Sequence, residues 1–150
     1  MAVRVQAEAF DHGAEVAAFG QGGRDTGAVV TFLGIVRDDS GRMTAMEIEH
    51  YPGMTERALQ AIEAEARARW DLTDCLILHR HGRLAPGEPI MMVATGSRHR
   101  AAAFAAAEFL MDYLKSRAPF WKKEIGDDGA AWVAARDEDE AALSRWQPKG

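Results

Sequence analysis

Lysines and aromatic residues are crowded together in the stretch YLKSRAPFWKKE, residues 113–124. We expect Lys115 in the last turn of a helix, and Lys122 and Lys123 on a strand that follows Pro119. A lysine held against aromatic side chains loses hydration, which lowers its pKa and makes it usable as an acid, a base or a nucleophile. The pair Lys115 and Lys122, separated by a proline turn, therefore indicates lysine chemistry.

Simpler roles for the same lysines remain open. A cation at Lys115 would complement the dipole of its helix, and a lysine on an edge strand discourages pairing with another chain. Neighbouring residues of a strand point to opposite faces, so Lys122 and Lys123 cannot both face one cleft. The residues themselves do not say which of the two points inward.

Positive charge elsewhere could hold an anionic ligand. SRHR, residues 97–100, opens a long helix, where free backbone N–H groups, His99 and two arginines would make an anion site. Ordinary capping by Ser97, with solvated arginines, explains the same residues. Arg37 ends an apolar strand, where a side chain can reach into a cleft, although a single terminal arginine is weak evidence.

The length of that helix limits how these groups can meet. A helix from Arg98 to Arg117 would be roughly 30 Å long at about 1.5 Å per residue. His99 and Lys115 are 16 positions apart, which separates them by about 24 Å and places them nearly on opposite faces. Within one chain they cannot serve one small-molecule site. Either one group alone is functional, or a second copy in a symmetric dimer supplies the other.

Composition excludes several classes of function. The chain has 150 residues, of which 47% are hydrophobic, and a formal net charge of -5, which is typical of a single soluble domain and unlike a basic nucleic-acid binder. Cys75 is the only cysteine, which excludes an internal disulfide, and we expect it to be a buried apolar residue. His50, His79 and His81 suggest a metal, but a convincing third ligand is lacking, so we favour a structural or surface role.

The N-terminal residues lack an apolar signal core, and no run approaches the about 18 apolar residues of a membrane span. We therefore expect a cytoplasmic protein. As a separate expectation, the protein needs no cofactor and no metal.

The elements that must position these residues follow from the hydrophobic pattern. We expect strands at 3–10, 27–37, 44–51, 74–82 and 90–97, helices at 13–19, 55–70 and 98–117, and a final hairpin around GDDG at 126–129. The strand at 27–37 is expected to be buried and to form a hairpin with 44–51. This order predicts an α+β fold in one domain over residues 1–150, with a charged tail from about residue 137 to 150 that is either helical or loose.

Five blocks of the sequence resemble one known family. They are VVTFLGIVR, EIEHYPGMTE, HRHGRLAPGE, SRHRAAAF and, most specifically, MDYLKSRAPFWKKE. They occur in the family's order and extend over roughly residues 27–146. On these blocks the chain is similar to the large, catalytic subunit of molybdopterin synthase. The resemblance implies an α/β hammerhead fold with an additional antiparallel sheet.

The resemblance also implies an activity and partners. The enzyme would be a sulfurtransferase that makes the dithiolene of molybdopterin from cyclic pyranopterin monophosphate. The sulfur would arrive as a C-terminal thiocarboxylate on the Gly-Gly tail of a small ubiquitin-like sulfur-carrier subunit. Two large subunits would form a central homodimer with a small subunit at each end, a heterotetramer. Neither nucleic acid nor a membrane is expected as a partner.

Residue by residue, the resemblance implies that Lys115 and Lys122 are the catalytic lysines. The pair His99 and Arg100 would bind the substrate phosphate from the neighbouring subunit. The full set of implied substrate-binding residues is Arg37, His99, Arg100 and Arg136.

Two other functions remain open. The chain could be a non-catalytic dimeric adaptor that binds a ubiquitin-like Gly-Gly tail and presents it to another enzyme. It could also be a lysine-dependent lyase that acts on a phosphorylated sugar or pterin alone and turns over without a partner.

Overall fold

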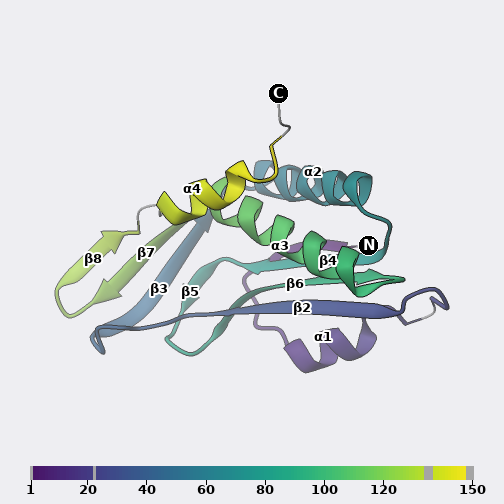
Figure 1. Cartoon of the computed structure of the whole chain (residues 1–150). Coiled ribbons are helices and arrows are strands. Elements are labelled where there is room, and N and C mark those ends of the chain that lie inside the picture. The colour runs from purple at the N-terminus through teal and green to yellow at the C-terminus, as the bar shows by residue number, and fades with distance from the viewer. Residues whose placement is uncertain (1, 22, 134–136, 148–150) are drawn as a thin grey trace.

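The computed structural model describes residues 2–21, 23–133 and 137–147, which form two four-stranded sheets and four helices (Figure 1). The first sheet has the order β1 (Ala2–Gln6), β4 (Leu72–Arg80), β6 (Pro89–Ser97) and β2 (Ala28–Ile35). The second has the order β5 (Gly82–Leu84), β3 (Met43–His50), β7 (Phe120–Gly126) and β8 (Gly129–Trp132). The helices are α1 (His12–Ala18), α2 (Met54–Arg69), α3 (Arg100–Ser116) and α4 (Asp137–Ser144).

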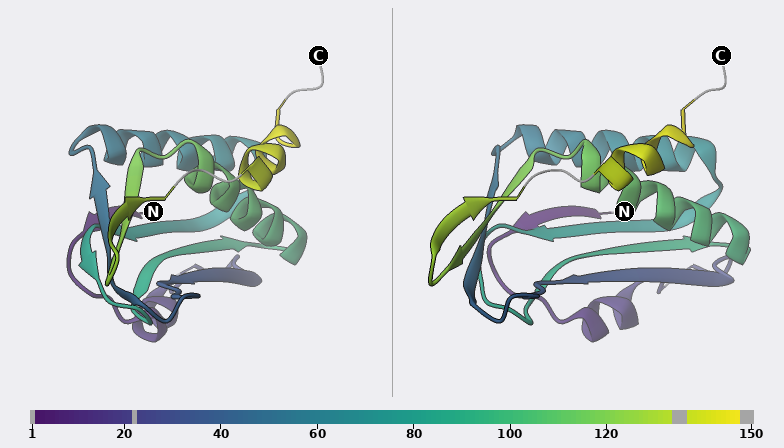
Figure 2. Two further views of the ribbon diagram at one scale, coloured as in Figure 1. Left: turned by 90° about the vertical axis from the view of Figure 1, so that its left-hand side faces the viewer. Right: turned by 60° about the vertical axis from the view of Figure 1, so that its left-hand side comes forward.

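Helices cover both faces of the first sheet, with α1 on one side and α2 and α3 on the other (Figure 2). Successive side chains of a strand alternate between faces. Cys75 and Ile77 of β4 pack in the cluster that contains the α2 and α3 core residues, whereas Leu76 and Leu78 pack with residues of the α1 side such as Val16. Burial on both faces explains the continuous apolar run of β4. Cys75 is buried, as expected.

The three predicted helices are confirmed with small shifts at their ends. Asp11 is the N-cap of α1, and its carboxylate accepts the N–H of Ala14 at 3.1 Å. The long helix α3 is unbroken from Arg100 to Ser116. No helix among the described residues is long and apolar enough to cross a membrane.

The hairpin predicted between residues 27–37 and 44–51 is wrong. β2 pairs with β6 in the first sheet, whereas β3 pairs with β5 and β7 in the second. The connection turns through Asp38, whose carboxylate accepts the N–H groups of Ser40, Gly41 and Met43. A polar turn between two strands resembles a hairpin locally, but here it carries the chain from one sheet to the other.

The expected burial of the strand at 27–37 is also wrong. β2 is an edge strand, and Val29, Phe32 and Ile35 are 44%, 41% and 51% exposed. An apolar, β-branched run predicts a strand, but it cannot say whether another layer covers that strand.

Two elements were absent from the predicted order. β5 has three residues, too few to show a pattern. α4 lies within the charged tail, for which a helix was one of the two expectations. This part of the chain packs on α3, since the ring of Trp146 contacts Phe109, and Leu143 of α4 is 2% exposed. The final hairpin is confirmed, because β7 and β8 pair around the turn at residues 127–128.

Phe109 joins α3 to α2 and the C-terminal segment, because its ring contacts Trp70, Tyr113 and Trp146 at centroid distances of 5.3, 4.6 and 5.5 Å. It is fully buried. We expect Phe109→Ala to lower the free energy of unfolding by about 3–5 kcal/mol, because it leaves a cavity among these rings. Chemical denaturation measures this. Phe104→Ala, on the same helix but 62% exposed, is the matched control, and an equal loss there would contradict the assignment.

Candidate active site

The end of α3 and the start of β7 lie next to each other (Figure 1), and they carry Lys115 and Lys122. Lys115 lies in the last turn of α3, and the N–H of the C-cap residue Arg117 donates to Tyr113 O at 2.7 Å. Pro119 then ends the helical conformation, since the residue before a proline is pushed toward extended geometry. The chain reverses and Lys122 follows as the third residue of β7.

The reversal is anchored by Thr55 near the start of α2. Its hydroxyl donates to Pro119 O at 3.0 Å and accepts the N–H of Tyr51 at 2.9 Å. The side chain is fully buried. Sequence reasoning treated Thr55 as a helix start and missed this contact, because nothing local indicates a partner 64 positions away.

The two lysines lie within electrostatic range of each other. Burial and, after it, the positive charge of Lys115 lower the pKa of Lys122 from 10.5 to about 8, against an opposing effect of Asp139. Lys115 itself is exposed. A partly buried amine beside an exposed one gives a positively charged surface, where negative charge would be stabilised more strongly than in bulk water.

Lys123 points away from this arrangement. Its amine lies over the indole ring of Trp132 on β8, 4.6 Å from the ring centroid, a cation–π contact. The choice between Lys122 and Lys123 is thus made by the pairing of β7 with β8, and Lys122 is the inward residue.

A histidine completes the surroundings of the lysines. His79 of β4 is 5% exposed, and its ring stacks on Phe120 with 3.7 Å between centroids and 15° between planes. Burial, together with the positive charges of Lys122 and Lys115, lowers the pKa of His79 to about 3, and a hydrogen bond to the Arg80 carbonyl opposes the shift. The ring is therefore neutral at physiological pH. Sequence reasoning assigned His79 a structural or surface role and did not place it beside the lysines.

Arg37 lies at the same end of the first sheet as His79. It follows β2, whose Ile35 pairs with Pro89 at the start of β6, and His79 pairs with Met91 of the same strand. The side chain is 75% exposed and forms an ion pair with Asp39 at 3.2 Å. An exposed ion pair is weak, so the guanidinium can turn to another anion at little cost.

His99 and Arg100 lie at the other end of β6. His99 is the N-cap of α3 in extended conformation without a side-chain capping bond, and Arg100 is the first helical residue. Both side chains are exposed. The expected cap, Ser97, is instead buried in β6 and donates its hydroxyl to Asp71 O at 2.8 Å, so the prediction that Ser97 caps α3 is wrong.

The unbroken helix keeps these two groups apart within one chain. His99 precedes the first residue of α3, and Lys115 lies in its last turn. The helix has 17 residues and spans about 25 Å. A site that uses both therefore needs a second chain. Arg136, the remaining predicted residue, lies outside the described residues.

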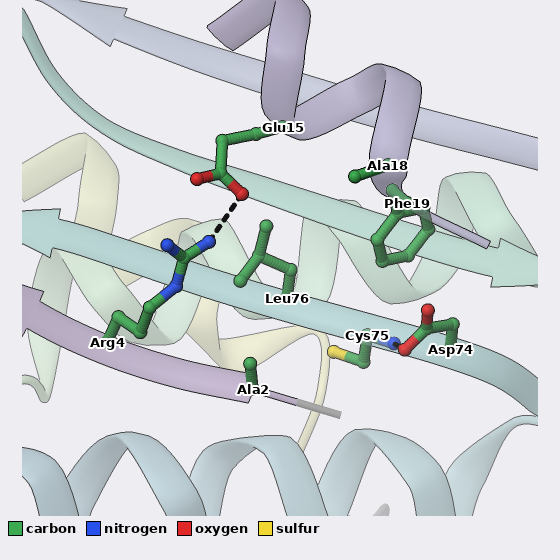
Figure 3. Close-up of a pocket in the computed structure, with 8 residues that line it drawn as sticks. All are labelled: Ala2, Arg4, Glu15, Ala18, Phe19, Asp74, Cys75 and Leu76. Atoms are coloured by element: carbon green, nitrogen blue, oxygen red, sulfur yellow. Dashed lines mark hydrogen bonds and ion pairs between the residues drawn. The ribbon is translucent and has the colours of Figure 1, made fainter. Parts of the chain in front are cut away.

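Two cavities among the described residues lie away from the lysines. One, of about 160 Å³, is lined by Ala2, Arg4, Glu15, Ala18, Phe19, Asp74, Cys75 and Leu76 (Figure 3). It is narrowed by the ion pair of Arg4 with Glu15. Burial and the charge of Glu63 raise the pKa of Cys75 to about 12, so its thiol is a poor nucleophile. The other, of about 390 Å³, lies at the far end of the β7–β8 hairpin around Asp127 and Asp128.

The three histidines considered as metal ligands pack as rings instead of converging on a point, and His79 stacks on Phe120. His50 and His81 lie 4.0 Å apart, centroid to centroid. Among the described residues, no group of three or more His, Cys, Asp or Glu is arranged to hold a metal ion.

Comparisons with known proteins identify the family of the chain. The family model described as MoaE protein matches residues 5–117. A molybdopterin synthase catalytic subunit of Cereibacter sphaeroides is 68% identical over 146 residues, which cover 97% of this chain and 100% of that protein. The solved molybdopterin biosynthesis MoaE protein from Burkholderia ambifaria MC40-6 has a TM-score of 0.82 at 54% identity, covering 97% and 98% of the two chains.

A more distant structure shares the fold. It is a protein–protein complex of subunits 1 and 2 of the molybdopterin-converting factor from Helicobacter pylori 26695, with a TM-score of 0.77 at 18% identity, covering 89% and 91%.

The fold combines a mixed sheet, an antiparallel sheet and four helices, and it is of the α+β class. The chain belongs to the MoaE family. The resemblance seen in the sequence is thereby confirmed, as are the predicted fold class and the expectation of a molybdopterin synthase catalytic subunit, a sulfur-transferring enzyme.

Proposed function

We propose that this chain carries out sulfur transfer at the turn between α3 and β7, with Lys115 and Lys122 as the catalytic lysines. The observation that carries the proposal is the partly buried Lys122 amine beside Lys115, whose pKa is lowered by loss of hydration and by the charge of Lys115. Cationic groups at a partly dry surface suit two anionic reactants, a thiocarboxylate tail and a phosphate-bearing pterin. A thin Gly-Gly tail would fit closely against Pro119 and the aromatic residues of β7, because glycine lets backbones approach.

In this proposal the residues divide the work. Arg37, His99 and Arg100 hold the phosphate and the ring of cyclic pyranopterin monophosphate. The terminal sulfur of the partner's tail attacks a carbon of the pterin side chain and displaces an oxygen substituent there. The thioester so formed is then cleaved at its acyl–sulfur bond, by water or first by Lys115, which leaves the sulfur on the pterin and frees the tail as a carboxylate. Lys115 activates the reacting centre, as acid or base or as a transient acceptor of the tail's acyl group. Lys122, as an ammonium, stabilises the developing negative charge. Two transfers consume two thiocarboxylated partners. Arg136 belongs to the same proposal as a further substrate-binding residue.

The helix length supports a site that is shared between two chains. We propose a homodimer in which His99 and Arg100 of one protomer complete the site of the other, with a small sulfur-carrier subunit on each protomer. The complex of two subunits seen in the Helicobacter pylori relative supports a partner of this kind. The exposed apolar side chains of β2 give one protomer surface to bury against another chain. We place the enzyme in the cytoplasm.

A reconstitution distinguishes this function from its alternatives. The purified chain is mixed with a thiocarboxylated small partner and cyclic pyranopterin monophosphate, and dithiolene formation is followed. Product without any third protein supports the enzyme. Binding without product would indicate the adaptor. Turnover of the pterin without the partner, with a lysine adduct trapped by borohydride, would indicate the lyase.

The lowered pKa of Lys122 predicts the pH dependence. With a pKa of about 8, about nine-tenths of the amine is still charged at pH 7, and the charge is lost above pH 8. If the ammonium stabilises the transition state, the turnover rate falls as pH rises through about 8. Single-turnover rates from pH 6 to 10 measure this.

Lys122→Arg is the informative variant for this pH profile. A guanidinium stays charged throughout the range, so any residual activity should lack the alkaline fall. A wild-type rate that instead climbs through pH 8 would show that Lys122 works as a neutral amine and would contradict the ammonium role.

A further inference from the structure

The chain passes from the first sheet to the second between β4 and β5, and two histidine rings lie at this corner. His81 faces His50 at a centroid distance of 4.0 Å, and both are partly exposed. His79 is buried and stacks on Phe120, the first residue of β7. The stacked rings of His79 and Phe120 therefore join β4 of the first sheet to β7 of the second.

The His79 ring is held in one orientation. Its Nδ1 lies 2.7 Å from the carbonyl oxygen of Arg80. A carbonyl oxygen can only accept, so Nδ1 carries the hydrogen and the neutral ring has an unprotonated Nε2. The Arg80 side chain is itself fixed, because its guanidinium donates to Ala7 O at 3.0 and 3.1 Å and to Pro89 O at 3.2 Å. The ring thus has little freedom to leave Phe120.

Phe120 links this ring to the catalytic lysine. Phe120 and Lys122 are two residues apart on β7, so their side chains leave the same face of the strand. The ring beneath Phe120 consequently lies beneath the face that carries the Lys122 amine. The electrostatics of His79 agree with this placement. Burial is the largest cause of its lowered pKa, and among nearby charged groups Lys122 and Lys115 lower it most.

We propose that His79 is a positioning residue for Lys122: its uncharged ring, held between the Arg80 carbonyl and Phe120, fixes the start of β7 and keeps water from the Lys122 amine. The inference rests on the proposed function, in which Lys122 serves sulfur transfer. The other charged groups that act on the amine are Lys115 from α3 and Asp139 from α4, and His81 acts on His79.

The composition makes a direct test possible, because the chain has only four lysines, at positions 115, 122, 123 and 149. Lysine labelled with ¹³C at Cε gives four signals, assigned by single substitutions, and their pH titration reports the pKa of Lys122 in the intact protein without substrate or partner. The variants are His79→Gln, which removes the flat ring, and His79→Phe, which keeps it. His81→Gln, at the same corner, is the control.

We expect His79→Gln to raise the pKa of Lys122 from about 8 toward its ordinary 10.5, by about one unit or more, because water reaches the amine. His79→Phe and His81→Gln should leave it within about 0.3 unit, since both retain the ring on Phe120. The alkaline fall of the turnover rate should move upward with the titration in His79→Gln and stay in place in His79→Phe.

An unchanged Lys122 titration in folded His79→Gln would overturn the inference, as would an equal rise in His79→Phe. If His79→Gln does not fold, His79→Leu, similar in volume but not flat, takes its place with the same expected rise. The two proposals fail separately. Full activity of Lys122→Gln would exclude a catalytic role of Lys122, whatever its pKa. A Lys122 pKa that does not change in His79→Gln would exclude only the positioning role of His79.

Discussion

Lys115→Ala lowers dithiolene formation by about 10²–10⁴-fold, the range typical of losing a positioned acid–base group, while the chain still folds and binds its small partner. The side chain is exposed in the last turn of α3, so its removal opens no cavity and changes stability by only about 0.5 kcal/mol. The rate is measured by single turnover with purified thiocarboxylated partner, and binding by calorimetry.

Two companion variants separate the possible causes of that loss. Lys115→Arg keeps the positive charge but cannot give up its proton or accept an acyl group near neutral pH. It should be nearly as inactive as alanine if Lys115 is an acid, a base or an acyl acceptor. Lys123→Ala, which removes the lysine that lies over Trp132, should retain activity. Full turnover by Lys115→Ala would exclude the role assigned to this residue.

Mixing two inactive chains should restore activity if the site is shared across a dimer. Arg100→Ala alone loses the phosphate contact that a protomer gives its neighbour, and Lys115→Ala alone loses the amine. In a mixed dimer, one of the two sites pairs an intact Lys115 with an intact Arg100. Random exchange makes half of the dimers mixed, so activity should recover to about a quarter of the wild-type value.

The control for this recovery is a mixture of Lys115→Ala with Lys122→Ala. Both residues lie at the same turn of one protomer, so each mixed dimer has no intact site and the mixture should stay inactive. Recovery in the control, or none with Arg100→Ala after verified subunit exchange, would place all the residues within one chain and contradict the shared site.

Much of the candidate site can be predicted from the sequence around Pro119. Pro119 predicts the end of α3 and the chain reversal into β7 that the structure contains. Lys115 lies four residues before this proline and Lys122 three residues after it. The separation of His99 from Lys115 also follows from the helix rise alone. These features depend on short-range sterics, which a local sequence determines.

Contacts between residues that are distant in the sequence could not be predicted from local patterns. Thr55 holds Pro119 from 64 positions away, and His79 stacks on a ring 41 positions further along the chain. The pattern of the strand at 27–37 did not reveal that β2 would pair with β6 and leave β3 to the second sheet.

By itself, the sequence determined the class of fold, the family and the residue types available for chemistry, because hydrophobic periodicity, turn residues and a specific motif are local properties. Only the tertiary structure decided that Lys122 and not Lys123 is the inward amine, and that His79 lies beneath it. Burial, and with it the pKa of an amine, depends on which strands and helices pack around a residue, and that packing joins segments from the whole chain.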